Sequence, residues 1–193
     1  MHDPLMLLTD DRRKARAAND PWANLCVLAT IDARHEPQAR VVVLRDLEQR
    51  FAVFINGTSP KHSELGLSPR HSVLVYLASL GVQYRLMVSF ERVPSAIVHA
   101  SWLERPRIPK VMDWLYESFQ VQSSEVPSRE FLIDRYAELD ARLPKSVEAP
   151  SHALGYFLVA HEVERLELAG DRVHARRHYR RVGLIWNAVE VLP

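Results

Sequence analysis

The stretch VQYRLMVSF, residues 82–90, alternates apolar and polar side chains with the period of a β-strand. Tyr84 and Leu86 would lie on one face, and Gln83 and Arg85 on the other. One face of such a strand builds a core, and the opposite face remains able to contact a ligand. The stretch therefore predicts a sheet with one buried side.

Other stretches rich in Val, Leu, Ile and aromatic residues are separated by turn residues and predict further strands. They are residues 24–32, 39–47, 51–57, 72–80, 82–93, 156–168 and 183–191. DARHEP (32–37) and DLEQR (46–50) indicate tight connections between successive strands. Such connections favour antiparallel meanders that close into a barrel.

Helices are expected between these strands, over residues 10–19, 60–67, 94–119 and 128–142. Ser128 precedes the last of them and is a suitable N-cap. The chain has no internal repeat and no Gly/Ser-rich linker, so we expect a single domain over residues 1–193.

The segment RVHARRHYRR, residues 172–181, holds five arginines, two histidines and no acid in a chain of net charge +1. If it is a strand, Arg172, His174, Arg176 and His178 share one face. The opposite face is only partly apolar, so we expect this strand at a sheet edge or at a subunit interface.

Composition and motifs exclude several classes of protein. The chain has 193 residues, 47% of them hydrophobic, and lacks the roughly 18-residue apolar run that crosses a bilayer, so we expect a cytoplasmic globular protein without membrane contact. Cys26, the single cysteine, lies in an apolar setting and is expected in the core. Walker, G-x-G-x-x-G and G-x-S-x-G motifs are absent from the sequence, which disfavours common nucleotide folds and serine hydrolases. We expect no metal, because His174 and His178 on a strand would stand roughly 13 Å apart.

What remains is a set of separated cations and side-chain amides on expected strands and helix starts. It comprises Arg40, Arg45, Lys61, Gln83, Arg105, Gln122, Arg172, His174 and Arg176. Dispersed donors of this kind suit an extended anionic ligand whose phosphate and ring are held at different points.

The order of several motifs resembles the pyridoxamine 5'-phosphate oxidase family. The series runs LATIDARHEPQARVVVLRDL, FAVFINGTSPKHSEL, PRHSVLVYLASLGVQYRLMVSFERV, ERPR, QSSEVPSRE and RVHARRHYRR, and it covers roughly residues 20 to 193. The resemblance implies an α+β, mainly β fold: an antiparallel FMN-binding split barrel of six to eight strands with peripheral helices. It also implies a homodimer with FMN at the subunit interface. Residues 1–19 would form an N-terminal helical arm, and residues 150–193 the strands that complete that interface.

The same resemblance implies an activity in pyridoxine biosynthesis. A C4' amine or alcohol on a phosphorylated pyridine ring would be oxidised by hydride transfer to flavin N5, with O2 as acceptor.

The resemblance also assigns cofactor contacts residue by residue. They are Arg40, Val41, Val42, Val43, Leu44, Arg45, Phe54, Ile55, Lys61, Gln83, Gln122, Ser123 and Arg176. Lys61 matches a phosphate-binding lysine, in keeping with its place in the first turn of an expected helix. Gln122 and Ser123 match a pair that in the family usually comes from the other subunit.

On the substrate side the resemblance implies Arg45 and Arg105 for the phosphate, with Arg172 and His174 over the ring as the catalytic pair. Arg40 and Arg45 are five residues apart, so a regular strand would point them to opposite faces. We therefore expect the strand to end near Leu44 or to contain a bulge.

Several positions depart from the family pattern. Pro60 replaces a phosphate-binding arginine, Leu166 replaces a tryptophan, and Ala175 replaces an aspartate. Ser101 and Pro109 stand where the family has a tyrosine and a serine that bind the substrate phosphate. These changes leave open a related oxidase or reductase acting on another aromatic ring, as in phenazine pathways, or a flavin-binding protein without catalysis.

A nucleic-acid binder that uses the basic segment is a weaker alternative, because the net charge is only +1 and the pI is near 8.0.

Overall fold

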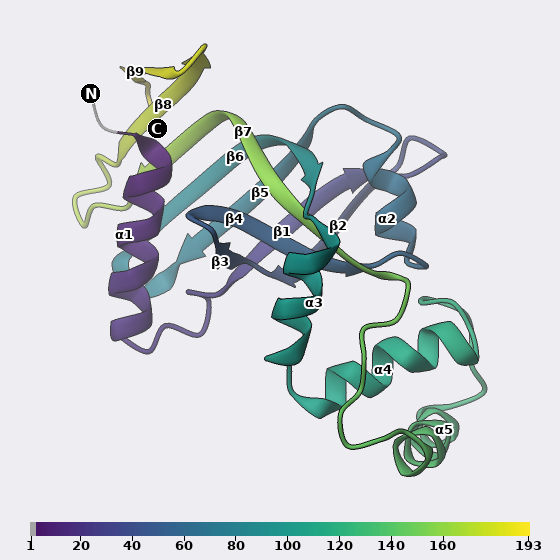
Figure 1. Ribbon diagram of the computed structural model, residues 1–193. Coiled ribbons are helices and arrows are strands. Elements are labelled where there is room, and N and C mark those ends of the chain that lie inside the picture. The colour runs from purple at the N-terminus through teal and green to yellow at the C-terminus, as the bar shows by residue number, and fades with distance from the viewer. Residues whose placement is uncertain (1–2) are drawn as a thin grey trace. The chain divides into compact units, whose positions relative to one another are not determined.

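The computed structural model describes residues 3–193, and its strands form one sheet of nine strands (Figure 1). The strands are β1 (Leu25–Ile31), β2 (Pro37–Val43), β3 (Arg45–Leu47), β4 (Arg50–Asn56), β5 (His71–Leu77), β6 (Val82–Arg92), β7 (Ala153–Glu167), β8 (Ala175–Val182) and β9 (Ile185–Glu190). Their order is β2-β1-β5-β6-β7-β4-β3, with β8 between β7 and β9. The sheet exceeds the expected six to eight strands because the predicted strand 39–47 is divided at Leu44 into β2 and β3.

The chain divides into two compact units, each described below by itself. Unit 1 comprises Met1–Val53, Leu67–Glu91 and Phe157–Pro193, and unit 2 comprises Phe54–Gly66 and Arg92–Tyr156. Strands β4, β6 and β7 pass from one unit into the other. The single domain expected over residues 1–193 stays a prediction.

The core of unit 1 follows from the alternation seen in the sequence. Leu28 lies opposite Val73, and Val73 opposite Leu86, so these three side chains share one face of β1, β5 and β6. They are 0%, 0% and 1% exposed. The other face of β6 carries Gln83 and Arg85, as the alternation predicts.

Both predicted tight connections are confirmed. Ile31 pairs with Pro37 across the first of them, and Leu47 pairs with Arg50 across the second. The second turn has two residues, Glu48 and Gln49, with φ of 49° and 62°. Two left-handed central residues give the twist that suits a two-residue hairpin.

Helix α1 (Pro4–Ala17) begins earlier than the predicted start at residue 10. Asp3 caps it by accepting a hydrogen bond from the Leu5 amide at 2.8 Å, and proline is favoured in a first helical turn. The helix is anchored to the sheet by Arg12, which is fully buried, pairs with Asp46 and donates to the Leu44 carbonyl at 2.7 Å.

Unit 2 contains the remaining α-helices of the described chain. They are α2 (Pro60–Leu65), α3 (Ser95–Leu103), α4 (Arg107–Ser118) and α5 (Arg129–Arg142). The single helix predicted over 94–119 is wrong: it is broken before Pro106, because a residue preceding proline is disfavoured in the helical region. The N-cap is confirmed, since the Phe131 amide donates to Ser128 Oγ at 3.1 Å. Helices α4 and α5 pack against each other (Figure 1).

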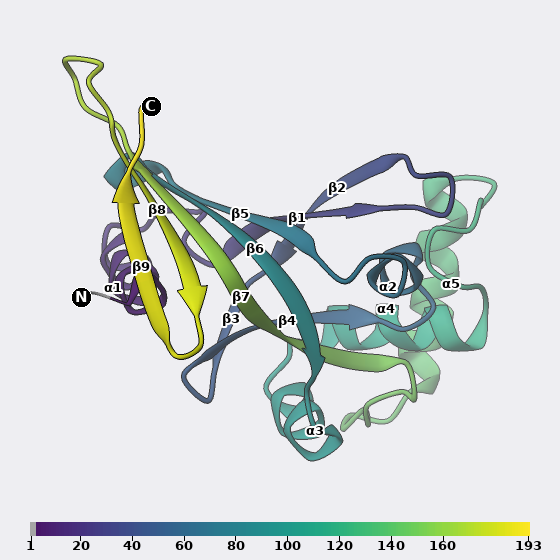
Figure 2. The same ribbon diagram turned by 90° about the horizontal axis from the view of Figure 1, so that it is seen from above.

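The basic segment forms β8 only from Ala175 onward, so the predicted four-residue ladder from Arg172 to His178 is wrong. Arg172 has a φ of 65° and lies in a turn that precedes the strand. Of the two positions expected for this strand, the sheet edge is wrong, since β8 pairs on one side with β7 and on the other with β9 (Figure 2). The subunit interface stays a prediction. The carboxyl-terminal β9 occupies the edge instead.

Within residues 3–193, no helix has both the length and the apolar character that a membrane crossing requires.

Candidate functional site

The predicted site residues divide between the two units. Unit 1 holds Arg40, Val41, Val42, Val43, Leu44, Arg45, Gln83, Arg172, His174 and Arg176, and unit 2 holds Phe54, Ile55, Lys61, Arg105, Gln122 and Ser123.

In unit 2 the structure brings Lys61 and Gln122 together. Lys61 lies in the first turn of α2, and its Nζ donates to Gln122 Oε1 at 3.0 Å. The backbone amide of Gln122 donates to Thr58 Oγ1 at 3.2 Å, which ties the segment after α4 to the turn before α2. A cation and a side-chain amide from segments 61 residues apart are therefore neighbours within one chain.

Asn56 adds a further donor to this part of unit 2. Its Oδ1 accepts from the Thr58 amide at 2.8 Å and from Thr58 Oγ1 at 2.6 Å. Its Nδ2 is buried and has no hydrogen-bond partner, although buried polar atoms are normally satisfied. An ammonium group, an amide and an unsatisfied NH2 group form a donor set that fits the oxygens of a phosphate. Sequence reasoning missed Asn56 and Thr58, for which the Asn-Gly pair ending the strand was the available signal.

The other predicted cofactor residues of unit 2 are neighbours in sequence of Asn56 and Gln122. Ile55 is 5% exposed and belongs to the core, while Phe54 is half-buried beside Gly155. Ser123 is exposed and has a φ of 75°, so the turn after Gln122 has a left-handed residue.

In unit 1 the strand that carries Arg40 ends just before Leu44, which is the first of the two alternatives expected from the sequence, a strand end or a bulge. Strand β2 ends at Val43, Leu44 is buried with its amide donating to the Asn24 carbonyl at 2.9 Å, and Arg45 begins β3. Arg40 donates to Thr30 Oγ1 and to the Leu28 carbonyl. Val41 and Val43 are 50% and 49% exposed.

The register places Arg40 and Gln83 on opposite faces of the sheet. Arg40 lies opposite Leu28, whose side chain faces the core. Gln83 lies opposite Tyr76, on the outer face shared by Val41 and Val43.

Gln83 lines an apolar cavity of about 420 Å³ on this outer face. The other lining residues are Trp22, Leu25, Cys26, Val27, Leu74, Tyr76 and Leu168. A mostly apolar lining with one side-chain amide suits an aromatic ring with polar groups at its edge. Cys26 is 2% exposed, and its burial raises the pKa of the thiol to about 12, in agreement with its predicted place in the core.

Arg176 is held by partners on both sides of β8. Its Nη2 donates to Glu164 Oε2 at 2.9 Å, and its Nη1 donates to the Leu192 carbonyl at 3.1 Å. Glu164 also accepts from Arg85 at 2.8 Å.

Arg172 and His174 lie in the turn between β7 and β8. The Arg172 side chain is exposed, and its backbone amide donates to the Ala169 carbonyl at 3.0 Å. His174 Nδ1 accepts from the Ala169 amide at 3.0 Å, so the ring proton resides on Nε2. His174 is thereby oriented with Nε2 as its remaining donor.

Arg105 lies in the loop between α3 and α4 and is not a free cation. Its Nη1 pairs with Asp113 at 2.5 Å, and its guanidinium stacks over Trp102 at 4.9 Å from the ring centroid. A phosphate bound there would share the guanidinium with a carboxylate.

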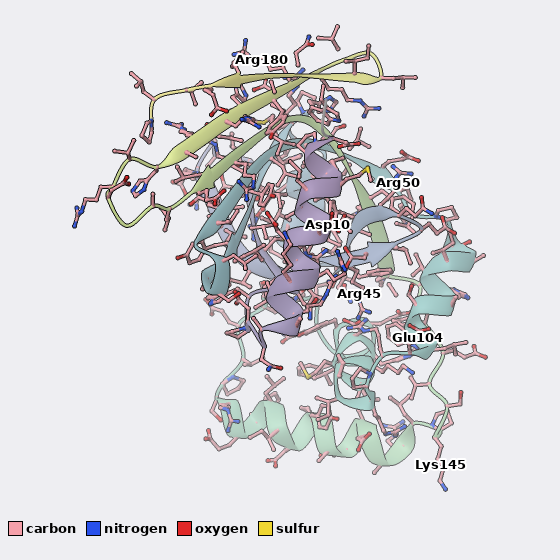
Figure 3. All side chains as sticks on the ribbon, turned by 90° about the vertical axis from the view of Figure 1, so that its left-hand side faces the viewer. Asp10, Arg45, Arg50, Glu104, Lys145 and Arg180 are labelled. Atoms are coloured by element: carbon pink, nitrogen blue, oxygen red, sulfur yellow. The ribbon has the colours of Figure 1, made fainter. Side chains whose placement is uncertain are left out.

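Part of the charge of the basic segment is balanced by acids on the neighbouring strands. His178 contacts Glu162 on β7 at 3.2 Å, and Arg177 pairs with Glu190 on β9. Figure 3 shows Arg180 on the β8 hairpin and Arg45 beside α1, so these two cations lie on different elements of unit 1.

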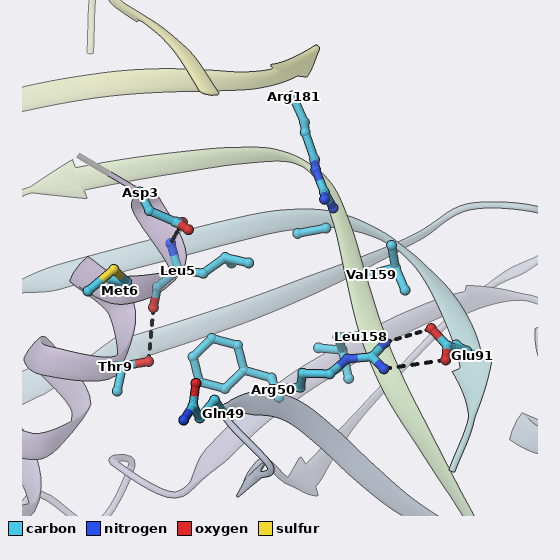
Figure 4. Close-up of a pocket in the computed structure, with 12 residues that line it drawn as sticks. Asp3, Leu5, Met6, Thr9, Gln49, Arg50, Glu91, Leu158, Val159 and Arg181 are labelled. Atoms are coloured by element: carbon cyan, nitrogen blue, oxygen red, sulfur yellow. Dashed lines mark hydrogen bonds and ion pairs between the residues drawn. The ribbon is translucent and has the colours of Figure 1, made fainter. Parts of the chain in front are cut away.

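Arg181, at the end of β8, lines a second cavity of unit 1 with a volume of about 430 Å³. Figure 4 shows its side chain pointing toward Val159 of β7, with Arg50 and Glu91 forming a two-bonded pair at 3.3 and 2.7 Å. The lining carries as many acids as arginines, namely Asp3 and Glu91 against Arg50 and Arg181, so it has no net charge.

No group of three or more His, Cys, Asp or Glu side chains in the described part of the chain could hold a metal ion.

Comparison with known proteins places this geometry in a family. No family model matches the chain. The pyridoxine/pyridoxamine 5'-phosphate oxidase of Ralstonia pickettii is 34% identical over 186 residues, which cover 95% of this chain and 84% of that protein. The enzyme of the same name from Polynucleobacter asymbioticus is 30% identical over 193 residues, covering 100% of this chain and 90% of that protein.

Two solved structures share the fold. PhzG from Burkholderia lata, in complex with tetrahydrophenazine-1-carboxylic acid, has a TM-score of 0.87 and 26% identity, covering 99% of this chain and 93% of that one. A pyridoxamine 5'-phosphate oxidase-related FMN-binding protein from Nostoc punctiforme has a TM-score of 0.77 and 17% identity, covering 97% and 95%.

The predicted fold class, a mainly β antiparallel split barrel with peripheral helices, is confirmed. The fold and the similar proteins place this chain in the class of split-barrel oxidoreductases. Within that class, the chain belongs to the pyridoxine/pyridoxamine 5'-phosphate oxidase family.

Proposed function

We propose that the chain is an FMN-dependent oxidase that acts on an amine or alcohol attached to a phosphorylated aromatic ring, with O2 as the final acceptor. The observation that carries the proposal is the donor cluster of Lys61, Gln122 and Asn56 in a chain of this family. FMN, when bound, supplies the two-electron acceptor, so the protein needs no nucleophile of its own.

Lys61 and Gln122 would bind the FMN phosphate in this proposal. The ammonium group offers charge-assisted hydrogen bonds, and Asn56 Nδ2 offers a donor that no protein atom satisfies. Pro60 offers no side-chain donor where the family has an arginine, so the Lys61 contact carries more of the phosphate binding.

Gln83 would contact the flavin ring from the outer face of the sheet, where the apolar cavity provides a surface for stacking. Arg40 faces the other side of the same sheet. Two residues on opposite faces are most simply brought to one ligand when two protomers contribute one each, which supports the proposal of a homodimer with FMN shared between subunits.

Arg45, Arg105, Arg172 and His174 would bind the substrate. His174, oriented through Nδ1, would donate from Nε2 to a polar group on the substrate ring, and the exposed guanidinium of Arg172 would cover the ring. Arg105 would contribute less to phosphate binding than a free arginine, since Asp113 already pairs with it.

A second candidate is oxidation of a different aromatic ring, such as a reduced tricyclic carboxylic acid. The similarity to PhzG over nearly the whole chain supports it, as does Leu166, a smaller side chain than the family's tryptophan. Ser101 and Pro109, which replace a tyrosine and a serine that bind the substrate phosphate in the family, also favour a substrate without a phosphate.

Flavin binding is tested by the absorption spectrum of the purified protein and by titration with FMN. Loss of a charge-assisted bond costs about 1.5–3 kcal/mol, so Lys61→Met should raise the Kd for FMN roughly tenfold to a hundredfold. Lys145→Met is the matched control, because Lys145 is an exposed lysine of the same unit, and it should leave the Kd unchanged. A wild-type protein that takes up no FMN would refute the proposal.

The substrate is tested by hydrogen peroxide release with pyridoxamine 5'-phosphate, with the unphosphorylated amine and with a dihydrophenazine carboxylate. Turnover of only the phosphorylated pyridine supports the first candidate, and turnover of only the tricyclic acid supports the second. Bound FMN without turnover of any of the three would support a flavin-binding protein without catalysis.

The shared site is tested with mixed dimers. Arg40→Ala and Gln83→Ala should each impair FMN binding in homodimers. A mixed dimer with one change in each subunit should recover one intact site of the two, and light scattering should give twice the chain mass. Equal loss of both sites in the mixed dimer would show that both residues come from one subunit.

A further inference from the structure

We propose that Glu164 is a positioning residue for the flavin, which holds the Arg176 guanidinium in place and lowers the positive charge that this part of the sheet presents. The inference rests on the proposed FMN site, in which Arg176 contacts the cofactor. It concerns a residue that carries no donor for FMN and acts through its neighbours.

Glu164 lies at the centre of an ion cluster on the outer face of unit 1. One oxygen, Oε2, accepts from Arg85 at 2.8 Å and from Arg176 at 2.9 Å. The Glu164 side chain is 12% exposed, whereas Arg176 and Arg85 are 30% and 54% exposed. The acid is thus the least exposed member of the cluster, and the two arginines reach it from neighbouring strands.

The cluster fixes the Arg176 guanidinium from two directions. Its Nη2 is bound to Glu164 and its Nη1 to the Leu192 carbonyl, while the Val191 amide donates to the Arg176 carbonyl at 2.9 Å. A guanidinium held by two partners loses little further freedom when it contacts a ligand, which is the physical meaning of a preorganised site.

The strand registers place this cluster on the same face as Gln83. Arg85 lies opposite Leu74 and Gln83 opposite Tyr76 on β5, and both β5 residues line the apolar cavity. Arg176 lies opposite Leu166 on β7, two residues from Glu164. The ion cluster and the cavity are therefore parts of one outer face.

The charge of the cluster follows by counting. Two guanidinium groups and one carboxylate leave a net charge of +1, and the acid is the least solvated of the three. At neutral pH, two-electron reduction places negative charge near N1 of a flavin, so positive charge in its surroundings stabilises the reduced form. Glu164 therefore tunes the reduction potential of bound FMN downward.

The test measures the midpoint potential of bound FMN in three variants. Glu164→Gln keeps an acceptor oxygen but removes the charge, so the potential should rise, equivalent to roughly fivefold or more tighter binding of reduced relative to oxidised FMN. Arg85→Gln removes a cation and keeps the Glu164–Arg176 pair, so the potential should fall, by less because Arg85 is more exposed. Glu162→Gln is the control: this acid lies on the same strand and contacts His178 instead.

Shifts of opposite sign in E164Q and R85Q, with E162Q at the wild-type value, would support the proposal, because a merely structural role moves no potential. Potentials equal to that of E162Q in both variants, in protein that binds FMN, would overturn this inference and leave the proposed function intact. R85Q retains the Glu164–Arg176 pair, so its potential can be measured even where E164Q does not fold. A downward shift in R85Q would then show that the charge of this cluster acts on bound FMN. Wild-type protein that binds no FMN would overturn the proposed function and, with it, this inference.

Discussion

Replacing Tyr84 by Phe removes one oxygen atom from the interior of unit 1, and we expect it to destabilise the protein strongly. The Tyr84 side chain is fully buried, its hydroxyl donates to Asp11 Oδ2 at 2.7 Å, and it accepts from Arg165 Nε at 2.9 Å. The three groups join α1, β6 and β7 through one network.

The magnitude follows from the two hydrogen bonds that are lost, each to a charged group. Bonds of this kind contribute about 1.5–3 kcal/mol each, but Asp11 and Arg165 also contact each other directly at 3.1 Å, so part of the network survives. We therefore expect the free energy of unfolding to fall by about 2–3 kcal/mol. For a chain of this size that is a decrease of roughly 4–12 °C in Tm.

The assay is thermal and urea unfolding at equal flavin occupancy, followed by circular dichroism. Tyr76→Phe on the adjacent strand is the control, since Tyr76 is 40% exposed, and it should stay within about 0.5 kcal/mol of wild type. If Y84F unfolds at the same temperature and urea concentration as Y76F, the buried network does not stabilise the fold as argued.

The same network predicts a pH dependence. Burial alone would raise the pKa of Asp11, but hydrogen bonds from Tyr84, Lys14 and Arg165 outweigh it and hold the pKa below its ordinary value of 3.8. A lowered folded-state pKa stabilises the protein above the unfolded-state pKa, and this contribution is lost as pH falls through the folded-state value. The difference in unfolding free energy between wild type and Asp11→Asn should thus be constant from pH 7 to about 5 and shrink below about 4, whereas a difference that grew on acidification would contradict the assignment.

Two further predictions concern packing and reactivity. A Cβ at Gly155 would approach Val93 Cβ at 3.0 Å and Phe54 Cε1 at 3.2 Å, so Gly155→Ala should cost about 1–3 kcal/mol in urea unfolding, while Gly170→Ala, with nothing within 4 Å, should cost less than about 0.5 kcal/mol. Equal effects of the two changes would refute the packing argument. Cys26 should react with a thiol reagent at pH 8 far more slowly in native protein than in urea, because burial raises the pKa of its thiol to about 12, and equal rates would show that the thiol is accessible.

Much of the fold could be predicted from local patterns. The alternation in residues 82–90 placed Tyr84 and Leu86 in the core, and the two tight turns fixed which strands pair. Such features depend on side chains a few residues apart, so they are visible without the tertiary structure. The break before Pro106 was also visible in the sequence, but the helical pattern on both sides of it obscured the end of one helix and the start of the next.

The candidate site was predicted in part. Lys61 and Gln122 were recognised by resemblance, and the structure makes them neighbours within one chain. Asn56, Thr58 and Glu164 were missed. The Asn56-Gly57 pair marked a turn but not a phosphate donor, and an acid in an ordinary strand, such as Glu164, has no distinctive sequence signal.

The sequence by itself determined that positive charge is concentrated near the C-terminus and that no acid lies within that segment. Only the tertiary structure decided what that charge contacts. Glu162 and Glu164 on β7 and Glu190 on β9 lie beside His178, Arg176 and Arg177 of β8. The physical reason is that strand pairing sets partners by register across the sheet, so an arginine is neutralised by acids that are distant along the chain and a few ångströms away in space.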